Sequence, residues 1–473
     1  MDTKKLRQKI LDLAIRGKLV PQNPNDEPAS VLLKRIRAEK EQLIKEGKIK
    51  RSKKSVASDT SHYENVPFEV PESWCWVKVA DISSVIVYGV SESAKSEGKF
   101  KLLRITDIQD NAVNWNTVPY TDYPESKSEN YILQAGDILF ARTGATVGKS
   151  YLVDDAVPEN AIYASYLIKV RVSNMIIPQY VKYFFESGFY WEQIANNSVG
   201  VGQPNVNGSS LGNLWVPIPP IQEQRRIVDK LVSWCLMIDK ISVNQELITQ
   251  QIEELRNHIL NLAISGKLVA QEPSDEPAIE LLKRINPMFS PTHNRHYENK
   301  PFLIPDSWLW VMGKDLFLPM KNCKPSGDYF KYIDIDSIDN QDCVIKCPKV
   351  LPVTAAPSRA TRYTQVGDIL FSMVRPYLKN IAIVTEGNCI ASTGFYVCSP
   401  NEALFSKYCY YLLISPYVIN GLTQFMKGDN SPSINNAHIS EWLYPIPPLN
   451  EQKRIVQKID EIFNYLDSIV AEL

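Results

Sequence analysis

A single stripe of apolar positions runs through the middle of the chain, from Ile221 to Ile264. Successive steps of four and three residues along it meet apolar side chains throughout, with the one exception of Gln245. The stripe consists of Ile227, Leu231, Trp234, Ile238, Ile241, Gln245, Ile248, Ile252, Leu255, Ile259 and Leu262. This spacing is typical of a helix that packs in a coiled coil. At about 1.5 Å per residue the stripe extends for roughly 50 Å, so the helix needs a partner that covers it.

The two ends of the chain repeat the two halves of this central stretch. The C-terminal stretch has apolar positions at the same steps, and both stretches open with Pro-Ile-Pro-Pro followed by Glu-Gln. These openings are Pro217 to Pro220 with Glu223 and Gln224, and Pro445 to Pro448 with Glu451 and Gln452. The N-terminal stretch from Leu6 to Val20, with Gly17 as its expected C-cap, matches Leu255 to Val269. We therefore expect a two-fold repeat drawn on a circle, whose ends lie side by side along the central helix.

Two modules lie between these helical stretches and begin alike. The stretch from Pro67 to Val77 recurs from Pro301 to Val311, and Gly-Asp-Ile-Leu-Phe recurs within both modules as a turn that leads into a strand. Elsewhere the two modules diverge. The pattern predicts an α+β fold, in which two modules of mixed α/β structure are separated by a long antiparallel helical coiled-coil scaffold with a pseudo-two-fold circular repeat. The predicted segments are an N-terminal helical arm with a basic linker (1–55), a first module (62–216), a central helical region (217–290), a second module (296–444) and a C-terminal helical arm (445–473).

Composition adds few constraints. The chain has 473 residues, of which 44% are hydrophobic, so it has room for two or three domains with sizeable cores. Its net charge is −1 at pH 7 and its pI is about 6.6, which neither supports nor excludes binding to nucleic acid. A basic run from Lys45 to Lys54 occurs only in the first copy of the repeat. We interpret it as a solvated linker, with phosphate contact as the alternative.

The cysteines and the absence of targeting signals indicate a cytoplasmic protein. Eight cysteines include no Cys-x2-Cys pair, and no secretory signal precedes them, so we expect reduced thiols. The nearest approach to a metal site is the spacing of Cys343 with Cys347 and of His293 with His296, and we expect no metal there. No apolar run approaches the roughly 20 residues that span a bilayer.

Candidate catalytic chemistry is weak. The stretch from Gly144 to Ser150 resembles a phosphate-binding loop, but three residues separate its glycines where the motif requires four, and a strand-like stretch follows. A nucleotide-dependent enzyme that uses Lys149 is therefore a minor alternative. No motif for a methyl-donor cofactor is present, and the five histidines form no triad pattern. We expect no catalytic residue, no cofactor and no metal in this chain.

Binding chemistry is better represented, in two corresponding loops. The loop from Gly200 to Gly208 and its counterpart from Lys427 to Asn436 are rich in amides, which can pair with adenine edges; ordinary turn chemistry is the alternative. Cations follow the repeated strand in both modules and could contact phosphate or guanine, with surface solvation as the alternative. The candidate DNA-contacting residues are Arg142, Lys149, Gln203, Asn205, Asn207, Arg375, Lys379, Ser431 and Asn435.

With the helix openings, the circular repeat and the two variable modules taken together, the chain resembles the DNA-specificity subunit of a type I restriction-modification system over nearly its full length. The resemblance implies two target-recognition domains, each reading one half of a bipartite site in double-stranded DNA. It also implies that two methyltransferase subunits dock on the helical scaffold and that nuclease-translocase subunits join them. Methylation of adenine with S-adenosylmethionine would then belong to the partner subunit. The competing interpretation is a coiled-coil scaffold protein with two protein-binding modules.

Overall fold

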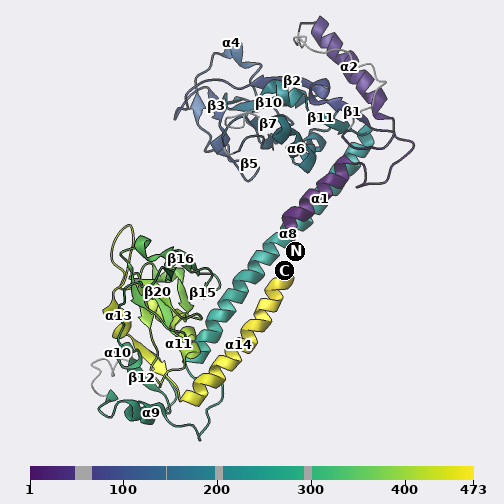
Figure 1. Cartoon of the computed structure of the whole chain (residues 1–473). Coiled ribbons are helices and arrows are strands. Elements are labelled where there is room, and N and C mark those ends of the chain that lie inside the picture. The colour runs from purple at the N-terminus through teal and green to yellow at the C-terminus, as the bar shows by residue number, and fades with distance from the viewer. Residues whose placement is uncertain (48, 50–66, 145, 198–205, 292–300) are drawn as a thin grey trace. The chain divides into compact units, whose positions relative to one another are not determined.

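The computed structural model describes residues 1–47, 49, 67–144, 146–197, 206–291 and 301–473 (Figure 1). The chain divides into two compact units, Met1–Asn244 and Gln245–Leu473. The boundary falls inside α8 (Ile221–Ile264), so each unit contains one half of this long helix. The two units are described separately below.

Within its described residues, the first unit combines helices with four small sheets. Its helices are α1 (Thr3–Ile15), α2 (Ala29–Lys45), α3 (Val79–Ile82), α4 (Glu125–Ser128), α5 (Pro178–Phe184), α6 (Gly188–Asn197), α7 (Gly208–Gly212) and the first half of α8. Its strands are β1 (Cys75–Lys78), β2 (Ser83–Tyr88), β3 (Phe100–Leu103), β4 (Ile108–Gln109), β5 (Ala112–Val113), β6 (Tyr120–Thr121), β7 (Ile138–Ala141), β8 (Ser150–Leu152), β9 (Ala161–Tyr163), β10 (Leu167–Val172) and β11 (Trp215–Ile218).

The second unit has a corresponding set of elements. Its helices are the second half of α8, α9 (Ala278–Ile285), α10 (Gly313–Leu316), α11 (Ser406–Leu413), α12 (Pro416–Thr423), α13 (Asn436–Ser440) and α14 (Leu449–Glu472). Its strands are β12 (Leu309–Met312), β13 (Tyr329–Ile333), β14 (Ile338–Asp339), β15 (Val344–Ile345), β16 (Lys349–Pro352), β17 (Ala360–Tyr363), β18 (Ile369–Ser372), β19 (Ile381–Ile383), β20 (Cys389–Ser392), β21 (Phe395–Cys398) and β22 (Leu443–Ile446).

The two modules share the pairing of their central strands although their sequences diverge. In the first unit β7 pairs antiparallel with β8 on one side and β10 on the other, and β3 lies between β6 and a parallel β9. In the second unit β18 pairs with β19 and β21, and β13 lies between β16 and a parallel β20. A two-stranded pair, β1 with β11 or β12 with β22, closes each module beside its long helix. The mixed helix and strand content agrees with the predicted α+β class.

The repeated Gly-Asp sequence forms the same turn in both modules. Gly136 and Gly367 have φ values of +89° and +91°, a conformation that glycine adopts with little strain. The carboxylate of the following Asp137 or Asp368 accepts the backbone N–H of the residue three positions earlier, at 2.9 Å and 2.8 Å. The strand that follows is buried on both faces. The predicted turn and strand are confirmed, and the motif is structural.

One terminal helix packs against each half of α8. In the first unit α1 runs along the first half of α8 (Figure 1), and Arg7 on α1 forms an ion pair with Asp239. In the second unit α14 runs along the second half, and Arg256 on α8 pairs with Asp467 on α14. Within each unit the contacts run in opposite directions along the two helices, as in an antiparallel pair.

The predicted stripe on α8 is wrong at one position. Ile227, Leu231, Ile238, Ile252 and Ile259 are buried as expected, but Leu255 is 44% exposed. The next residue, Arg256, lies against α14 in place of Leu255. Its guanidinium centre is 4.7 Å from the Phe463 ring centroid, and it forms an ion pair with Asp467. A long aliphatic stem that ends in a charge can cover apolar surface, which a reading of apolar positions alone does not detect.

A polar joint fastens each long helix to its module through the repeated Glu-Gln sequence. In the first unit the Trp74 indole N–H donates to Glu223 at 2.9 Å, and the Gln22 amide donates to the same carboxylate at 2.5 Å. In the second unit the corresponding bonds to Glu451 have the same lengths and come from Trp308 and Gln271. Burial raises the pKa of both glutamates, and the indole and amide donors partly offset that shift.

The second residue of the pair completes the polar joint. The Gln224 amide is fully buried, where its oxygen accepts the Ile177 N–H at 3.0 Å and its nitrogen donates to the Pro219 carbonyl at 3.0 Å. Gln452 makes the equivalent bonds to Phe405 and Pro447 at 2.7 Å and 3.0 Å. Buried amides satisfied in this way fix the geometry around them, so each module is held at its helix by the same contacts.

Glycine ends the helices that meet these joints. Gly17 follows α1 and Gly266 follows α8, with φ values of +67° and +73°. A Cβ on either glycine would also collide with a proline ring, Pro71 or Pro305 respectively. The expected role of Gly17 at the end of the first helix is therefore confirmed, although α1 itself ends at Ile15.

Candidate nucleic-acid interface

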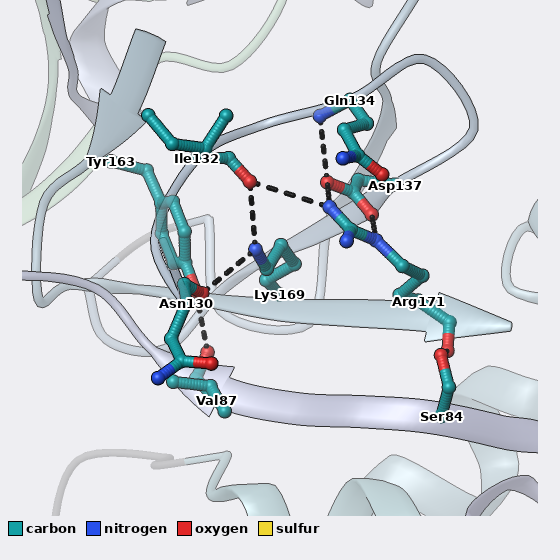
Figure 2. A network of polar contacts seen from close by, with 9 residues as sticks. All are labelled: Ser84, Val87, Asn130, Ile132, Gln134, Asp137, Tyr163, Lys169 and Arg171. Atoms are coloured by element: carbon teal, nitrogen blue, oxygen red, sulfur yellow. Dashed lines mark hydrogen bonds and ion pairs between the residues drawn. The ribbon is translucent and has the colours of Figure 1, made fainter. Parts of the chain in front are cut away.

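A buried polar network supports the β7–β10 pair of the first module (Figure 2). The Arg171 guanidinium donates to both oxygens of Asp137, at 2.6 Å and 2.7 Å. Lys169 is 1% exposed, and its ammonium donates to the carbonyls of Asn130 and Ile132 at 3.0 Å each. Burial lowers the pKa of Lys169 to about 8. The network ties the segment before β7 to β10 and so fixes the start of β7.

The lowered pKa of Lys169 does not by itself indicate catalysis. Its ammonium is enclosed, lies 5.4 Å from the Tyr163 ring centroid and is directed at two backbone carbonyls. The Tyr163 hydroxyl in turn donates to the Val87 carbonyl at 3.1 Å, which links the network to β2 (Figure 2). A buried lysine whose donors are met by the protein is a structural cation.

The second module lacks the arginine of this network. Val170 pairs with Ile138 in the first module, and Cys398 pairs with Ile369 in the second. Position 399, which follows Cys398, therefore corresponds to Arg171, and it is a serine. Asp368 is 1% exposed, and within the described residues its Oδ1 has no hydrogen-bond partner. Burial raises the pKa of Asp368 above that of a free aspartate, and hydrogen bonds from Gln365 and Ser399 partly offset the shift.

Asp368→Asn is expected to stabilise the protein at pH 7 by on the order of 1 kcal/mol, because a buried charge without a cation is removed. A carboxyl group whose pKa is raised by folding contributes stability below its unfolded pKa and loses it as the pH rises through its folded pKa. The gain from Asp368→Asn should therefore be present at pH 7 and absent near pH 4. Urea unfolding at the two pH values measures it, and a variant that is less stable than wild type at pH 7 would refute the argument. Asp137→Asn is the matched control and should be destabilising.

In the first unit, Arg142 lies where the end of β7 meets the loop before α7. Its guanidinium centre is 5.0 Å from the Tyr88 ring centroid, within range of a cation–π contact. The Tyr88 hydroxyl accepts the Gly208 N–H at 2.9 Å, and the Arg142 carbonyl accepts the Val206 N–H at 3.2 Å. The Arg142 N–H donates to the carbonyl of Tyr166, whose side chain is 62% exposed. The structure thus brings Arg142, the two tyrosines and the end of the amide-rich loop together.

The remaining first-unit candidates have different settings. Lys149 is exposed and precedes β8, so a strand follows the glycine-rich stretch, as the sequence predicts. Asn207 is the N-cap of α7, and its side chain accepts the Ser210 N–H at 2.8 Å. That bond is the turn chemistry named as the alternative for this loop. Gln203 and Asn205 lie outside the described residues.

In the second unit, Arg375 is engaged with the amide-rich loop itself. Its N–H donates to the Pro432 carbonyl at 2.9 Å, and its Nη2 donates to the Asn430 carbonyl at 2.8 Å. Ser431 is exposed, whereas the Asn435 side chain caps α13 by accepting the His438 N–H at 3.2 Å. The equivalent asparagines 207 and 435 thus have the same capping contact.

Lys379 lies at the far end of the 3-10 turn Pro376–Leu378 that begins after Arg375. Both flanking residues adopt left-handed backbone conformations, with φ values of +48° for Arg375 and +53° for Lys379. Such conformations are uncommon for residues other than glycine and are often found at functional sites. The turn leaves Tyr377 and Leu378 partly exposed between the two cations.

Sequence reasoning missed several aromatic residues at these surfaces. The Tyr88 ring lies beside the Arg142 guanidinium and the Tyr166 carbonyl accepts the Arg142 N–H, while Phe425 stacks on His438 with ring centroids 4.9 Å apart and planes 27° apart. Aromatic faces beside cations and amides are common where proteins contact bases. No spacing in the sequence relates Tyr88 to Arg142, because they meet only through the pairing of β2 and β7 with β10.

The described part of the chain offers no alternative site for a metal. It contains no group of three or more His, Cys, Asp or Glu side chains placed to hold an ion. His293 and His296, half of the spacing noted above, lie outside the described residues. In the same part of the chain no helix is both long and apolar enough to cross a membrane.

The family model and the relatives found by comparison with known proteins are all of one kind. The family model described as "Type I restriction modification DNA specificity domain" matches residues 71–254 and 318–473. The specificity subunit of the type I restriction enzyme EcoAI from Escherichia coli is 28% identical, with 97% of this chain and 88% of that protein covered. The EcoEI specificity subunit, also from Escherichia coli, is 26% identical over 99% of this chain and 90% of that protein.

Solved structures with the same fold are more distant in sequence. The HsdS subunit from Thermoanaerobacter tengcongensis superposes with a TM-score of 0.50 at 18% identity, covering 85% of this chain and 92% of that one. A chain from a structure described as the basis of complex assembly and conformational transition of the type I R-M system superposes with a TM-score of 0.54. That chain is also 18% identical, with 86% of this chain and 94% of it covered.

Proposed function

The chain belongs to the family of type I restriction-modification DNA-specificity proteins, and from this premise we propose that it reads a bipartite site in double-stranded DNA, one half with each unit. The observation that carries the proposal is that the two units have equivalent frameworks but different surfaces at the end of the repeated strand. Each unit has the same polar joint and the same pairing of its central strands. The surfaces at the end of the repeated strand differ, with Tyr88 and Arg142 in one unit and Arg375 with its loop in the other. Two modules with equivalent frameworks and different binding surfaces suit a DNA site whose two halves differ in sequence.

The domain arrangement that we propose follows from this repeat. Segments 62–216 and 296–444 are the target-recognition domains, while 1–55, 217–290 and 445–473 form an antiparallel coiled-coil scaffold with a pseudo-two-fold circular repeat. Two equivalent ion pairs support it, Arg7–Asp239 and Arg256–Asp467. In the sequence repeat the two arginines occupy corresponding positions, and so do the two aspartates. The exposed Leu255 makes the packed seam less regular than the coiled-coil pattern predicts.

The partners follow from the family. Specificity is a recognition role, which agrees with the expectation that the chain is not itself an enzyme. We propose that two methyltransferase subunits dock on the helical scaffold, that they carry S-adenosylmethionine, and that nuclease-translocase subunits complete the complex. The complex would act in the cytoplasm on duplex DNA.

We propose different roles for the candidate residues. Arg142, supported by the Tyr88 ring, would contact a guanine edge, and Lys149 and Lys379 would contact phosphates. Gln203 and Asn205 would read bases in the first half-site. Asn207 and Asn435 would hold the start of α7 and α13 rather than touch DNA, because their side chains are already engaged.

Genome-wide mapping of methylated adenines tests the proposal. The chain is produced with its methyltransferase partner in a host that lacks both, and a second strain carries the partner with a disrupted copy of this gene. The expected result is methylation at one motif of two short blocks around an unread spacer, only in the first strain. Binding of the complex to that duplex should weaken steeply as salt rises. A motif that does not depend on this gene would contradict the proposal, as would salt-independent binding.

A further inference from the structure

We propose that Asp429 and Asn430, at the tip of the second-unit loop 427–436, read base edges that carry exocyclic amino groups, and that Arg375 positions this tip without touching DNA. The inference rests on the proposed function, since it names the side chains with which the second unit would recognise its half-site. It departs from the sequence expectation, in which Arg375, Ser431 and Asn435 were the candidate contacts of this loop.

The base of the loop is fixed by backbone pairing. Lys427 and Ser433 exchange two N–H···O bonds, each of 3.0 Å, which closes a short hairpin. The Ile434 N–H donates to the Met373 carbonyl at 2.9 Å, which ties the hairpin to the residue after β18. Gly428 has a φ of +107°, so the chain can turn sharply directly after Lys427.

Arg375 holds the tip from one side. Its N–H and Nη2 bond the carbonyls of Pro432 and Asn430 at 2.9 Å and 2.8 Å, so one residue bonds the loop at two points. Its left-handed backbone, with φ of +48°, is the kind of local strain that surrounding structure must maintain. An arginine whose guanidinium donates to the loop backbone is a positioning residue, and a lysine ammonium would not reproduce the geometry of the Nη2 bond to the Asn430 carbonyl.

The C-terminal side of the loop is held by α13 and an aromatic stack. The Asn435 side chain accepts the His438 N–H at 3.2 Å, and the His438 Nδ1 accepts the Asn435 N–H at 3.3 Å. The His438 ring stacks on Phe425, which precedes the loop. Both ends of the loop are therefore anchored, and the side chain of Asn435 is not available for a base.

The tip itself is polar, exposed and unengaged. Asp429, Asn430 and Ser431 are all exposed. In the described ranges none of their side chains has a hydrogen bond or an ion pair to the protein, although the Asn430 carbonyl accepts from Arg375. A tip held in one conformation before binding loses less entropy on binding, so its contacts contribute more to affinity and specificity.

The chemistry of the tip selects its ligand. A carboxylate is repelled by phosphates, so a loop that presents Asp429 to DNA gains only where an amino group donates to it, as cytosine N4 or adenine N6 does in the major groove. The adjacent Asn430 amide can pair with the N6 and N7 atoms of adenine. The tip is therefore suited to base edges with amino groups and unsuited to the sugar-phosphate backbone.

Methylation mapping of the assembled complex tests this reading. Asp429→Ala and Asn430→Ala should each reduce discrimination at one position of one block, by about 5- to 150-fold per lost contact, and leave the other block unchanged. Arg284→Ala removes an exposed arginine of the same unit that pairs with Glu276, and it should leave the motif intact. An unchanged motif in both tip variants, or changes in both blocks, would overturn the assignment.

Two substitutions separate positioning by Arg375 from direct contact. Arg375→Lys keeps the charge and the backbone bond to Pro432 but removes the Nη2 bond to the Asn430 carbonyl, so it should relax the same position as Asp429→Ala, as should Arg375→Ala. The salt dependence of binding should then stay as in wild type for both variants. If only Arg375→Ala altered the motif and it also flattened the salt dependence, Arg375 would contact phosphate and its positioning role would fail. A wild-type complex without any bipartite motif would instead refute the proposed function itself.

Discussion

Ile252→Asp is expected to cost several kcal/mol of unfolding free energy, the largest effect of any single substitution considered for this protein. Ile252 is 7% exposed in the second half of α8 and belongs to the core of the second unit. A carboxylate placed there must be buried without a cation or must be protonated on folding, and either outcome is costly. The midpoint of thermal unfolding, followed by circular dichroism, should fall markedly or the second unit should unfold.

Leu255→Asp provides the matched control. It introduces the same charge three residues further along the same helix, where the wild-type side chain already faces solvent. Its cost should be less than about 1 kcal/mol, as for other exposed sites. Equal midpoints for the Ile252 variant and wild type would show that α8 is not packed along this face.

Arg171→Ala is the second substitution with a large expected effect, about 3–5 kcal/mol. It leaves Asp137 buried without its bidentate partner, beside a lysine whose donors are already directed at two carbonyls. Urea unfolding of the variant should show the loss in the first unit. Its effect on DNA reading should follow from that loss, because the network fixes the start of β7, the strand that ends just before Arg142.

The double variant Asp137→Asn with Arg171→Leu distinguishes a lost interaction from an unpaired charge. Asparagine keeps an acceptor for the Gln134 N–H, and no charge remains uncompensated. Removing both partners of a buried pair is far less costly than removing one. The double variant should therefore be more stable than Arg171→Ala, and the opposite order would show that the pair itself is the main contribution.

The sequence predicted those features of the fold that depend on residues close together in the chain. The stripe on α8, the repeated Glu-Gln openings and the Gly-Asp turn could all be predicted, because apolar spacing and backbone conformation depend on local residues. Leu255 was predicted wrongly because Arg256 can cover apolar surface with its stem, and residue class alone does not reveal which of two neighbours faces the partner helix. The shared pairing of the central strands in the two modules was not predicted, because backbone hydrogen bonds keep it while the side chains diverge.

The candidate site shows the same limit. Arg142 and Arg375 follow equivalent strands and have the same residue type, so the sequence suggests one role for both. The structure places Arg142 beside a tyrosine ring and Arg375 against the carbonyls of a loop more than fifty positions away. Lys169 is a further case. A lysine in a strand is expected to be exposed, but Lys169 is buried by contacts to carbonyls that lie 37 and 39 residues away in the sequence. Long-range hydrogen bonds of this kind leave no local pattern.

The most direct test of the central claim, that each unit reads its own half-site, is methylation mapping of three complexes. One carries Arg142→Ala in the first unit, one carries Asp429→Ala in the second, and one carries both. The account predicts that the two single variants relax different blocks of the motif and that the double variant relaxes both, with the spacer unchanged. Relaxation of the same block by both single variants, or of both blocks by either one, would contradict it.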